Sequence, residues 1–147
     1  MKKILIITYY WPPKGGVGVQ RWLKLSKYLY KENYDITIYT TKDGVGTLED
    51  RSLEKSIPSG LNILKHTIFE PQKYFKSFFK KRFASDFLLK KETGMLNKLM
   101  LWLRANLFIP DSRCLWINPS ISFLDNYLRK NPVDVIISSG PPHSMHM

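Results

Sequence analysis

The chain has 147 residues, 44% of them hydrophobic and 24% charged, which is typical of a globular protein and excludes a disordered or fibrous one. It contains no apolar run long enough to span a membrane, and the run Ile4–Ile7 is too short for a signal peptide. The single cysteine, Cys114, excludes an internal disulfide and has no CxxC or histidine cluster beside it. We therefore expect a cytoplasmic protein without a metal site.

The charge of the chain is its first unusual feature. The sequence has 23 Lys and Arg residues against 12 Asp and Glu residues, a net charge of +11. Residues 65–104 hold ten of the basic residues and three of the acidic ones, a net charge of +7 in that stretch. This concentration of positive charge predicts an anionic partner.

The stretch 2–41 is expected to form a strand, a helix and a second strand. The β-branched run at 2–8 is typical of a strand buried on both faces in a parallel sheet. From 19 to 30, apolar residues recur at spacings of three and four with basic residues between them, which predicts an amphipathic helix. The run at 35–40 predicts the second strand, joined to the first by a right-handed crossover.

The rest of the chain is expected to add two strands and three helices. Glycine and proline residues break any periodicity at 42–60, which predicts a loop with one helical turn. The strands are expected at 61–65 and 133–138, and the helices at 73–91, 95–107 and 117–130. The segment Asn118-Pro119-Ser120 is expected to start the last helix.

These elements predict an α/β fold, a Rossmann-like parallel sheet with flanking helices, in the strand order third, second, first, fourth. A helix should follow the fourth strand and cover it, but the chain ends at Met147. We therefore expect 1–147 to be an incomplete domain of a longer protein.

Two loops leave the carboxyl ends of adjacent strands in this arrangement, at 9–17 and 138–144, and ligands bind at such an edge. In the first loop, Gly15, Gly16 and Gly18 come just before the helix, so backbone N–H groups there could point at a phosphate. The spacing matches neither the GxGxxG nor the P-loop pattern. From spacing alone, a tight turn without a ligand is an equally good interpretation.

In the second loop, His143 follows a glycine and two prolines and could donate to a sugar hydroxyl or share a proton. The more ordinary interpretation is a histidine at a helix start with a solvated ring. Between the helices, Asp111 is expected to accept backbone N–H bonds and Trp116 to lie in the core. No pattern supports a role for His66 or His146.

The basic stretch 73–91 is also rich in aromatic residues. Helical spacing places Phe75, Phe78 and Phe79 on one face, and Lys76 and Lys80 on the opposite face. This pattern is typical of a helix lying in an anionic membrane interface with its aromatic side down. A core-packed helix with a solvated basic face is an equal alternative, and single-stranded nucleic acid is a third, which no motif supports.

Three segments of the chain together resemble the amino-terminal half of bacterial family 4 glycosyltransferases, which have the GT-B fold of two Rossmann-like domains facing a cleft. In chain order they are ILIITYYWPPKGGVGVQRWLKLSKYL, LFIPDSRCLWINPS and DVIISSGPPHSMH, spread from residue 4 to residue 146. A strand followed by YYWPPxGGVGVQR is a far narrower match than a glycine pair.

The resemblance implies a retaining transfer of a sugar from a nucleotide-sugar, the co-substrate, to a lipid-linked or polysaccharide acceptor, without a further cofactor. In that family the amino-terminal domain mainly receives the acceptor, and its glycine loop approaches the donor diphosphate, which implies this role for Gly15, Gly16 and, less directly, Gly18. A histidine in a later loop commonly touches the transferred sugar, and His143 fits that position. Docking on the inner face of the plasma membrane through the basic aromatic helix is implied too.

One part of the family pattern is missing from these residues. The carboxyl-terminal domain, which supplies most nucleotide contacts and a paired glutamate motif in the family, is absent. We therefore expect the chain alone to be inactive. The alternative from another class is a non-catalytic, basic Rossmann-like module that binds anionic membrane or nucleic acid.

Overall fold

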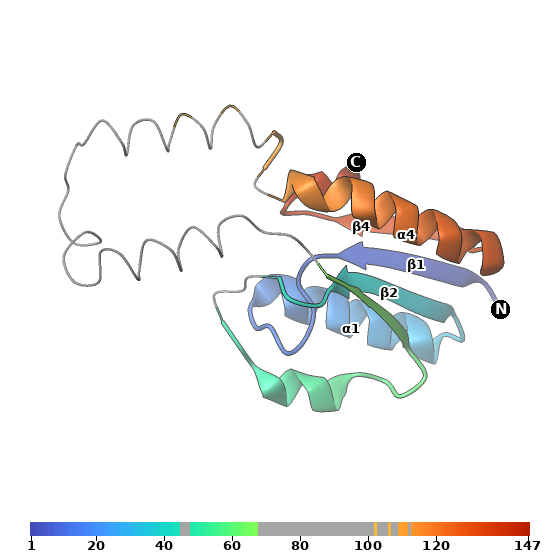
Figure 1. The fold of residues 1–147 in the computed structure, drawn as a ribbon. Helices are drawn as coiled ribbons and strands as arrows, with labels where there is room; N and C mark the ends of the chain where they lie inside the picture. The colour runs from blue at the N-terminus through green and yellow to red at the C-terminus, as the bar shows by residue number, and fades with distance from the viewer. Residues whose placement is uncertain (45–47, 68–101, 103–105, 107–108, 112) are drawn as a thin grey trace.

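The centre of the protein is a sheet of four strands (Figure 1). The computed structural model describes residues 1–44, 48–67, 102, 106, 109–111 and 113–147. The strands are β1 (Lys3–Thr8), β2 (Asp35–Thr41), β3 (Asn62–His66) and β4 (Val135–Ser139). Their order is β3-β2-β1-β4, and each neighbouring pair is parallel. The predicted α/β, Rossmann-like sheet and its strand order are confirmed.

Strand β1 is the middle of the apolar core because its side chains are apolar on both faces of the sheet. Ile4, Leu5 and Ile6 are all at most 6% exposed. Ile6 lies opposite Ile38 of β2 on one side and Ile137 of β4 on the other. Successive side chains of a strand point to opposite faces, so β1 contributes to two separate cores.

Among the described elements, one helix covers each face of the sheet (Figure 1). Helix α1 (Val17–Lys31) packs its Leu23 into the first core, and α4 (Ile117–Lys130) lies over the second. The first core consists of Ile4, Ile6, Trp11, Leu23, Ile36 and Ile38. The second consists of Leu5, Tyr9, Tyr39, Trp116 and Met145. Trp116 is therefore a core residue, as its sequence context predicts.

Three short 3₁₀ turns complete the described elements: η1 (Arg51–Ser56), η2 (Cys114–Trp116) and η3 (His143–His146). The first is the single turn expected in the loop 42–60, and Asp50 starts it by accepting the N–H of Ser52 at 3.0 Å. The start of α4 differs from the prediction. Turn η2 runs directly into the helix, so α4 begins at Ile117 without a side-chain cap, and the segment Asn118-Pro119-Ser120 lies inside it.

Strand β4 forms one edge of the sheet. The side chains of Val135 and Ile136 are 44% and 52% exposed. The apolar run 133–138 predicts a buried strand, but these two side chains of β4 are exposed. The reason is that no strand in the described ranges pairs with the outer edge of β4.

Two further expectations concern helices. Those expected at 73–91 and 95–107 lie outside the described residues. Of the helices that are described, none has the length and the apolar character needed to cross a membrane.

Candidate functional site

The loops after β1 and β4 leave the same edge of the sheet. Since β1 and β4 are adjacent and parallel, both loops begin at the carboxyl ends of neighbouring strands. Strands β2 and β3 lie on one side of β1, and β4 lies on the other side. The strand order therefore reverses between β1 and β4. A reversal of this kind is the usual ligand position in an open parallel sheet.

The loop after β1 is held at its start by two buried aromatic side chains. Tyr9 is 0% exposed and lies in the core beneath α4, whereas Trp11 is 2% exposed and lies in the core beneath α1. The ring of Tyr9 contacts Trp116 edge-on, with centroids 6.1 Å apart. The first residues of the loop are therefore part of both cores.

Main-chain bonds hold the rest of this loop against the segment 48–50. Gly15 donates its N–H to the carbonyl of Leu48 at 2.9 Å, and Asp50 donates its N–H to the carbonyl of Pro13 at 2.7 Å. A Cβ at Gly15 would lie 3.2 Å from the Cβ of Asp50, so glycine permits this close approach. The loop is a short antiparallel pairing rather than an open turn.

The ammonium group of Lys14 lies beneath the loop. Its Nζ donates to the hydroxyl of Thr41 at 2.9 Å and to the carbonyl of Tyr9 at 3.3 Å. It also lies 4.4 Å from the centroid of the Tyr9 ring, which is a cation–π distance. A Cβ on Gly44 would collide with both Lys14 and Thr41, so only glycine fits there. Lys14 thereby links the ends of β1 and β2.

The predicted phosphate-binding glycines differ in conformation. Gly16 precedes α1 with φ 106° and ψ 168°, a region that residues with a Cβ rarely adopt. Gly18 lies in the first turn of α1, and a Cβ there would meet nothing within 4 Å. The N–H of Gly15 already has its acceptor, so any phosphate would meet the N–H groups that follow Gly16 at the helix start.

A polar pocket of about 340 Å³ lies between this loop and the ends of β2 and β3. It is lined by Trp11, Pro12, Pro13, Lys14, Thr41, Lys42, Asp43, Gly44, Glu49 and Lys65. The lining carries three ammonium and two carboxylate groups, together with the hydroxyl of Thr41. Its volume suits a small polar ligand. Sequence reasoning missed this pocket, since its residues come from four separate stretches: 11–14, 41–44, Glu49 and Lys65.

The loop after β4 carries the exposed His143 between buried neighbours. Ser144 and Met145 are each 6% exposed, and Met145 lies in the core with Tyr9 and Trp116. The His143 ring has its centroid 6.5 Å from that of His146. Within the described part of the chain, no hydrogen bond or ring contact joins His143 to Gly15, Gly16 or Gly18. The two loops lie at the same edge of the sheet, but His143 does not contact the three glycines in either of these ways.

Asp111 lies against the His143 turn, although it is far away in sequence. Its Oδ2 accepts the N–H of Ser144 at 2.9 Å, and its Oδ1 accepts the Ser144 hydroxyl at 3.0 Å and the N–H of Arg113 at 2.8 Å. Partial burial raises the pKa of the Asp111 carboxyl, but the hydrogen bonds from Ser144 and Arg113 outweigh it and leave the pKa below its ordinary value of 3.8. The prediction that Asp111 accepts backbone N–H bonds is confirmed.

Two more side-chain contacts hold the end of β4. The indole N–H of Trp22 on α1 donates to the hydroxyl of Ser139. The hydroxyl of Ser138 lies 2.8 Å from Nδ1 of His146. Sequence reasoning assigned nothing to His146, because a contact eight residues along the chain depends on the turn between them.

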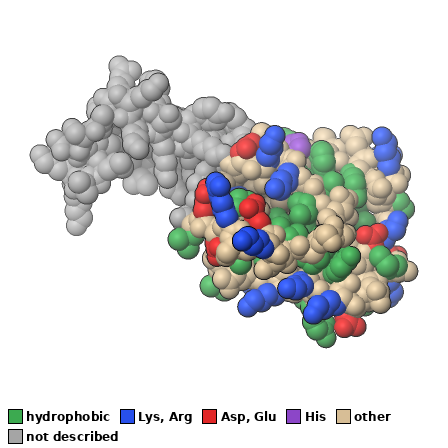
Figure 2. Space-filling model, turned by 90° about the horizontal axis from the view of Figure 1, so that it is seen from below, with side chains coloured by type: hydrophobic (Ala, Val, Ile, Leu, Met, Phe, Trp, Pro, Cys, Tyr) green, Lys and Arg blue, Asp and Glu red, His purple; other side chains and the backbone are tan. Residues whose placement is uncertain are grey.

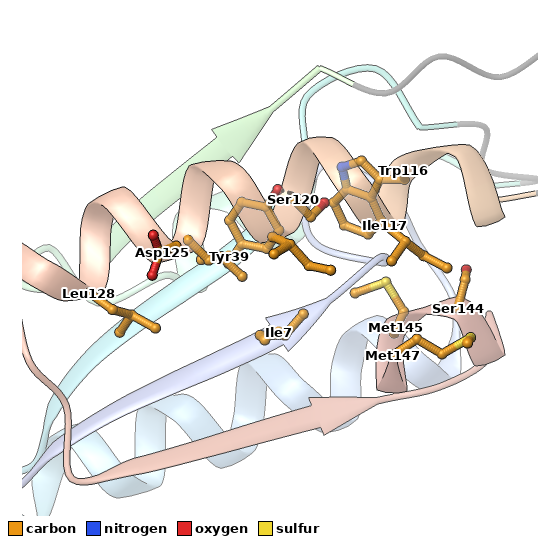
Figure 3. A pocket seen from close by; sticks show the side chains of 12 residues that line it. Ile7, Tyr39, Trp116, Ile117, Ser120, Asp125, Leu128, Ser144, Met145 and Met147 are labelled. Atoms are coloured by element: carbon orange, nitrogen blue, oxygen red, sulfur yellow. Dashed lines mark hydrogen bonds between the residues drawn. The ribbon is translucent and has the colours of Figure 1, made fainter.

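An apolar groove of about 310 Å³ lies on the α4 side of the sheet (Figure 3). Figure 3 shows Ile7 of β1, Met145 and Met147 facing the space beside α4. At its inner end Tyr39 stacks on Trp116, with centroids 5.4 Å apart, and donates to the hydroxyl of Ser120 at 2.9 Å. Burial raises the pKa of the Tyr39 phenol, although the bond to Ser120 opposes it, so the phenol stays neutral and donates.

The predicted membrane-facing residues Phe75, Phe78, Phe79, Lys76 and Lys80 all lie outside the described residues. Basic side chains are nevertheless spread over the described part of the face seen from below (Figure 2). Helix α1 has no acidic residue and carries four exposed basic ones: Arg21, Lys24, Lys27 and Lys31. Among the described residues, no group of three or more His, Cys, Asp or Glu could hold a metal ion.

Comparison with known proteins gives no match: no family model, no curated protein and no solved structure matches the chain.

Proposed function

We propose that the chain is the amino-terminal, acceptor-side domain of a retaining glycosyltransferase that resembles family 4. Such an enzyme moves a sugar from a nucleotide-sugar to a lipid-linked or polysaccharide acceptor. The observation that carries the proposal is the adjacency of β1 and β4. It brings the glycine loop and the His143 loop, which both belong to the resembling segments, to one edge of the sheet at the reversal of strand order.

The start of α1 supports a contact with the donor diphosphate. The N–H groups of a first helical turn lack partners within the helix, and the helix dipole favours an anion there. Gly16 and Gly18 have no side chains, and the space that a Cβ at either position would enter is open for at least 4 Å, so an anion could approach the backbone there. The diphosphate of a nucleotide-sugar is an anion of the required kind.

The exposed ring of His143 supports a contact with the transferred sugar. Its neighbours Ser144 and Met145 are buried, so the main chain at this position is fixed while the imidazole faces outward. An imidazole carries both a hydrogen-bond donor and an acceptor nitrogen in its neutral form, so it can donate a hydrogen bond to a sugar hydroxyl or accept one.

The polar pocket beside the glycine loop supports binding of a hydroxyl-rich acceptor. The carboxylates of Asp43 and Glu49 are acceptors for hydroxyl groups, and the ammonium groups of Lys42 and Lys65 suit a phosphate on a lipid-linked sugar. The pocket and the start of α1 share the loop 11–16, so an acceptor and a donor bound there would be neighbours.

Sugar transfer by the protein encoded by the complete gene tests this function, because the family places most nucleotide contacts in a second domain. We expect Gly16→Val and His143→Ala each to lower the rate of transfer at least about 100-fold, since each removes a group that acts on donor or transferred sugar. Tyr28→Ala is the control, because Tyr28 is 64% exposed on α1. Undiminished transfer in both site variants would overturn the site assignment.

The net charge of +11 supports peripheral binding to an anionic membrane on the cytoplasmic side. We expect vesicles with anionic lipid to sediment the chain, and neutral vesicles to leave it in solution. Replacing Phe75, Phe78 and Phe79 with serine should release it. Retention on vesicles without any sugar transfer by the complete protein would favour the alternative, a non-catalytic binding module.

A further inference from the structure

Asp111 connects two segments that are 33 residues apart in the sequence. Asp111 lies just before η2, and Ser144 lies in η3, which follows β4. Within the described residues, Asp111 accepts one hydrogen bond from Arg113, just before η2, and two from Ser144, with donor–acceptor distances between 2.8 and 3.0 Å. A carboxylate with three such donors is held in one orientation.

Both oxygens of the carboxylate are used. Oδ1 accepts from the N–H of Arg113 and the hydroxyl of Ser144, and Oδ2 accepts from the N–H of Ser144. The bond from Arg113 closes a local turn that fixes the Asp111 side chain. An asparagine in the same place would keep one acceptor and would turn an amide N–H toward a second donor. The contact therefore requires aspartate and not only a side chain of this shape.

The contact acts next to His143. Ser144 follows His143 directly, and both its backbone N–H and its hydroxyl are bound by Asp111. On the other side of the turn, Met145 donates its N–H to the carbonyl of Pro142 at 3.2 Å. Met145 is in the core, so its main chain is already fixed. Asp111 is the partner that fixes the main chain between His143 and this buried position.

We propose that Asp111 is a positioning residue: it holds the turn so that His143 faces the edge of the sheet where the donor's sugar would lie. This inference rests on the proposed function, since it assigns Asp111 a part in the same site. Asp111 acts through Ser144 and does not touch the reacting groups. Loss of the carboxylate does not change the chemistry of the His143 ring. It does allow the turn that carries the ring to shift. A misplacement of about 1 Å can lower a rate about 100-fold.

Two measurements on Asp111→Asn test the proposal. In the chain itself, we expect the Ser144 amide to exchange with solvent at least about tenfold faster, because it loses its acceptor. In the complete protein, we expect kcat for sugar transfer to fall about 10- to 100-fold, with KM for the nucleotide-sugar within about twofold of its original value. Asp125→Asn is the matched control, since Asp125 bonds only Arg129 on the surface of α4.

The double variant Asp111→Asn/His143→Ala separates positioning from a merely structural role. If Asp111 acts through His143, the double variant has the same kcat as His143→Ala alone. A fall in kcat as large in the His143→Ala background as in the original protein would overturn the proposal, and so would unchanged exchange of the Ser144 amide. Should Asp111→Asn not fold, Ser144→Ala removes only the hydroxyl contact and is expected to lower kcat in the same direction by a smaller factor.

Failure of the proposed function has a different signature. If the complete protein transfers no sugar, or if His143→Ala is fully active, the function assigned to the site is wrong. Exchange of the Ser144 amide still decides whether Asp111 holds the turn.

Discussion

The two loops at the carboxyl edge of the sheet are held in place by different means. The loop after β1 is held by main-chain bonds to 48–50 and by Tyr9 and Trp11, which lie in opposite cores. The loop after β4 has two buried side chains, Ser144 and Met145, of which only Met145 is apolar, and it is also held by side-chain hydrogen bonds to Asp111, from Trp22 and between Ser138 and His146. The first loop contributes a buried aromatic side chain to each of the two cores, whereas the second contributes Met145 to one core and relies more on side-chain hydrogen bonds.

The difference matters for how each loop would meet a ligand. Main-chain pairing and apolar burial resist local opening, whereas partly exposed side-chain hydrogen bonds are each worth about 1 kcal/mol and open more readily. A rigid glycine loop suits an anion that is bound by fixed N–H groups. In the second loop, which is held largely by side-chain hydrogen bonds, the position of His143 has to be set by a separate residue. The carboxylate of Asp111 can have this role.

The largest expected effect comes from removing the apolar contact of each loop. Trp11→Ala should lower the free energy of unfolding by about 3–5 kcal/mol, because a large side chain that is 2% exposed leaves a cavity. Met145→Ala should cost about 2–3 kcal/mol, since Met145 lines a groove that is already open on one side. Denaturant unfolding measures both values.

Tyr28→Ala serves as the control for these variants and should stay within about 0.5 kcal/mol of the original protein. A cost for Met145→Ala that equals or exceeds the cost for Trp11→Ala would contradict the view that apolar burial holds the first loop more firmly than the second.

The second effect concerns the glycines of the first loop. Gly16→Ala should lower the free energy of unfolding by about 1–3 kcal/mol, because φ 106° with ψ 168° is unfavourable for any residue with a Cβ. Gly18→Ala should raise it by about 0.5 kcal/mol, because alanine is the better helix former. A Cβ at either position would meet nothing within 4 Å, so the two variants differ in backbone conformation alone. Equal effects of the two, measured by thermal unfolding, would rule out the positive φ at Gly16.

The elements of the sheet could be predicted from the sequence because each is a local pattern. The apolar run of β1 and the three- and four-residue spacing of α1 need no partner to be recognised. The contacts that shape the two loops are of another kind. Gly15 pairs with Leu48, and Asp111 binds Ser144, so each depends on how distant segments meet once the sheet has formed. Local chemistry predicts that Asp111 accepts backbone N–H groups, but it does not show that one of them belongs to the His143 turn.

The third effect concerns the contact between α1 and the end of β4. Trp22→Phe keeps an aromatic ring, although a smaller one, and removes the N–H that bonds Ser139, so it should cost at least about 1 kcal/mol in the free energy of unfolding. Ser139→Ala should cost less in the Trp22→Phe background than in the original protein, since the two side chains share one bond. Additive costs in denaturant unfolding would mean that this bond does not hold the second loop.

The smallest effect is the pH dependence of the contact between Asp111 and Ser144. The pKa of the Asp111 carboxyl lies below its ordinary value of 3.8 in the folded protein, so the unfolded chain takes up the proton first as the pH falls. The stabilising contribution is therefore complete above about pH 4 and is lost as the pH falls through the lower pKa of the folded state. Subtracting the free energy of unfolding of Asp111→Asn from that of the original protein, at each pH between about 2 and 6, isolates this contribution from those of the other carboxylates. A difference that stays constant over that range would mean that the carboxylate is not bound by Ser144, and that the second loop is held by its other contacts, those of Met145, Trp22 and His146.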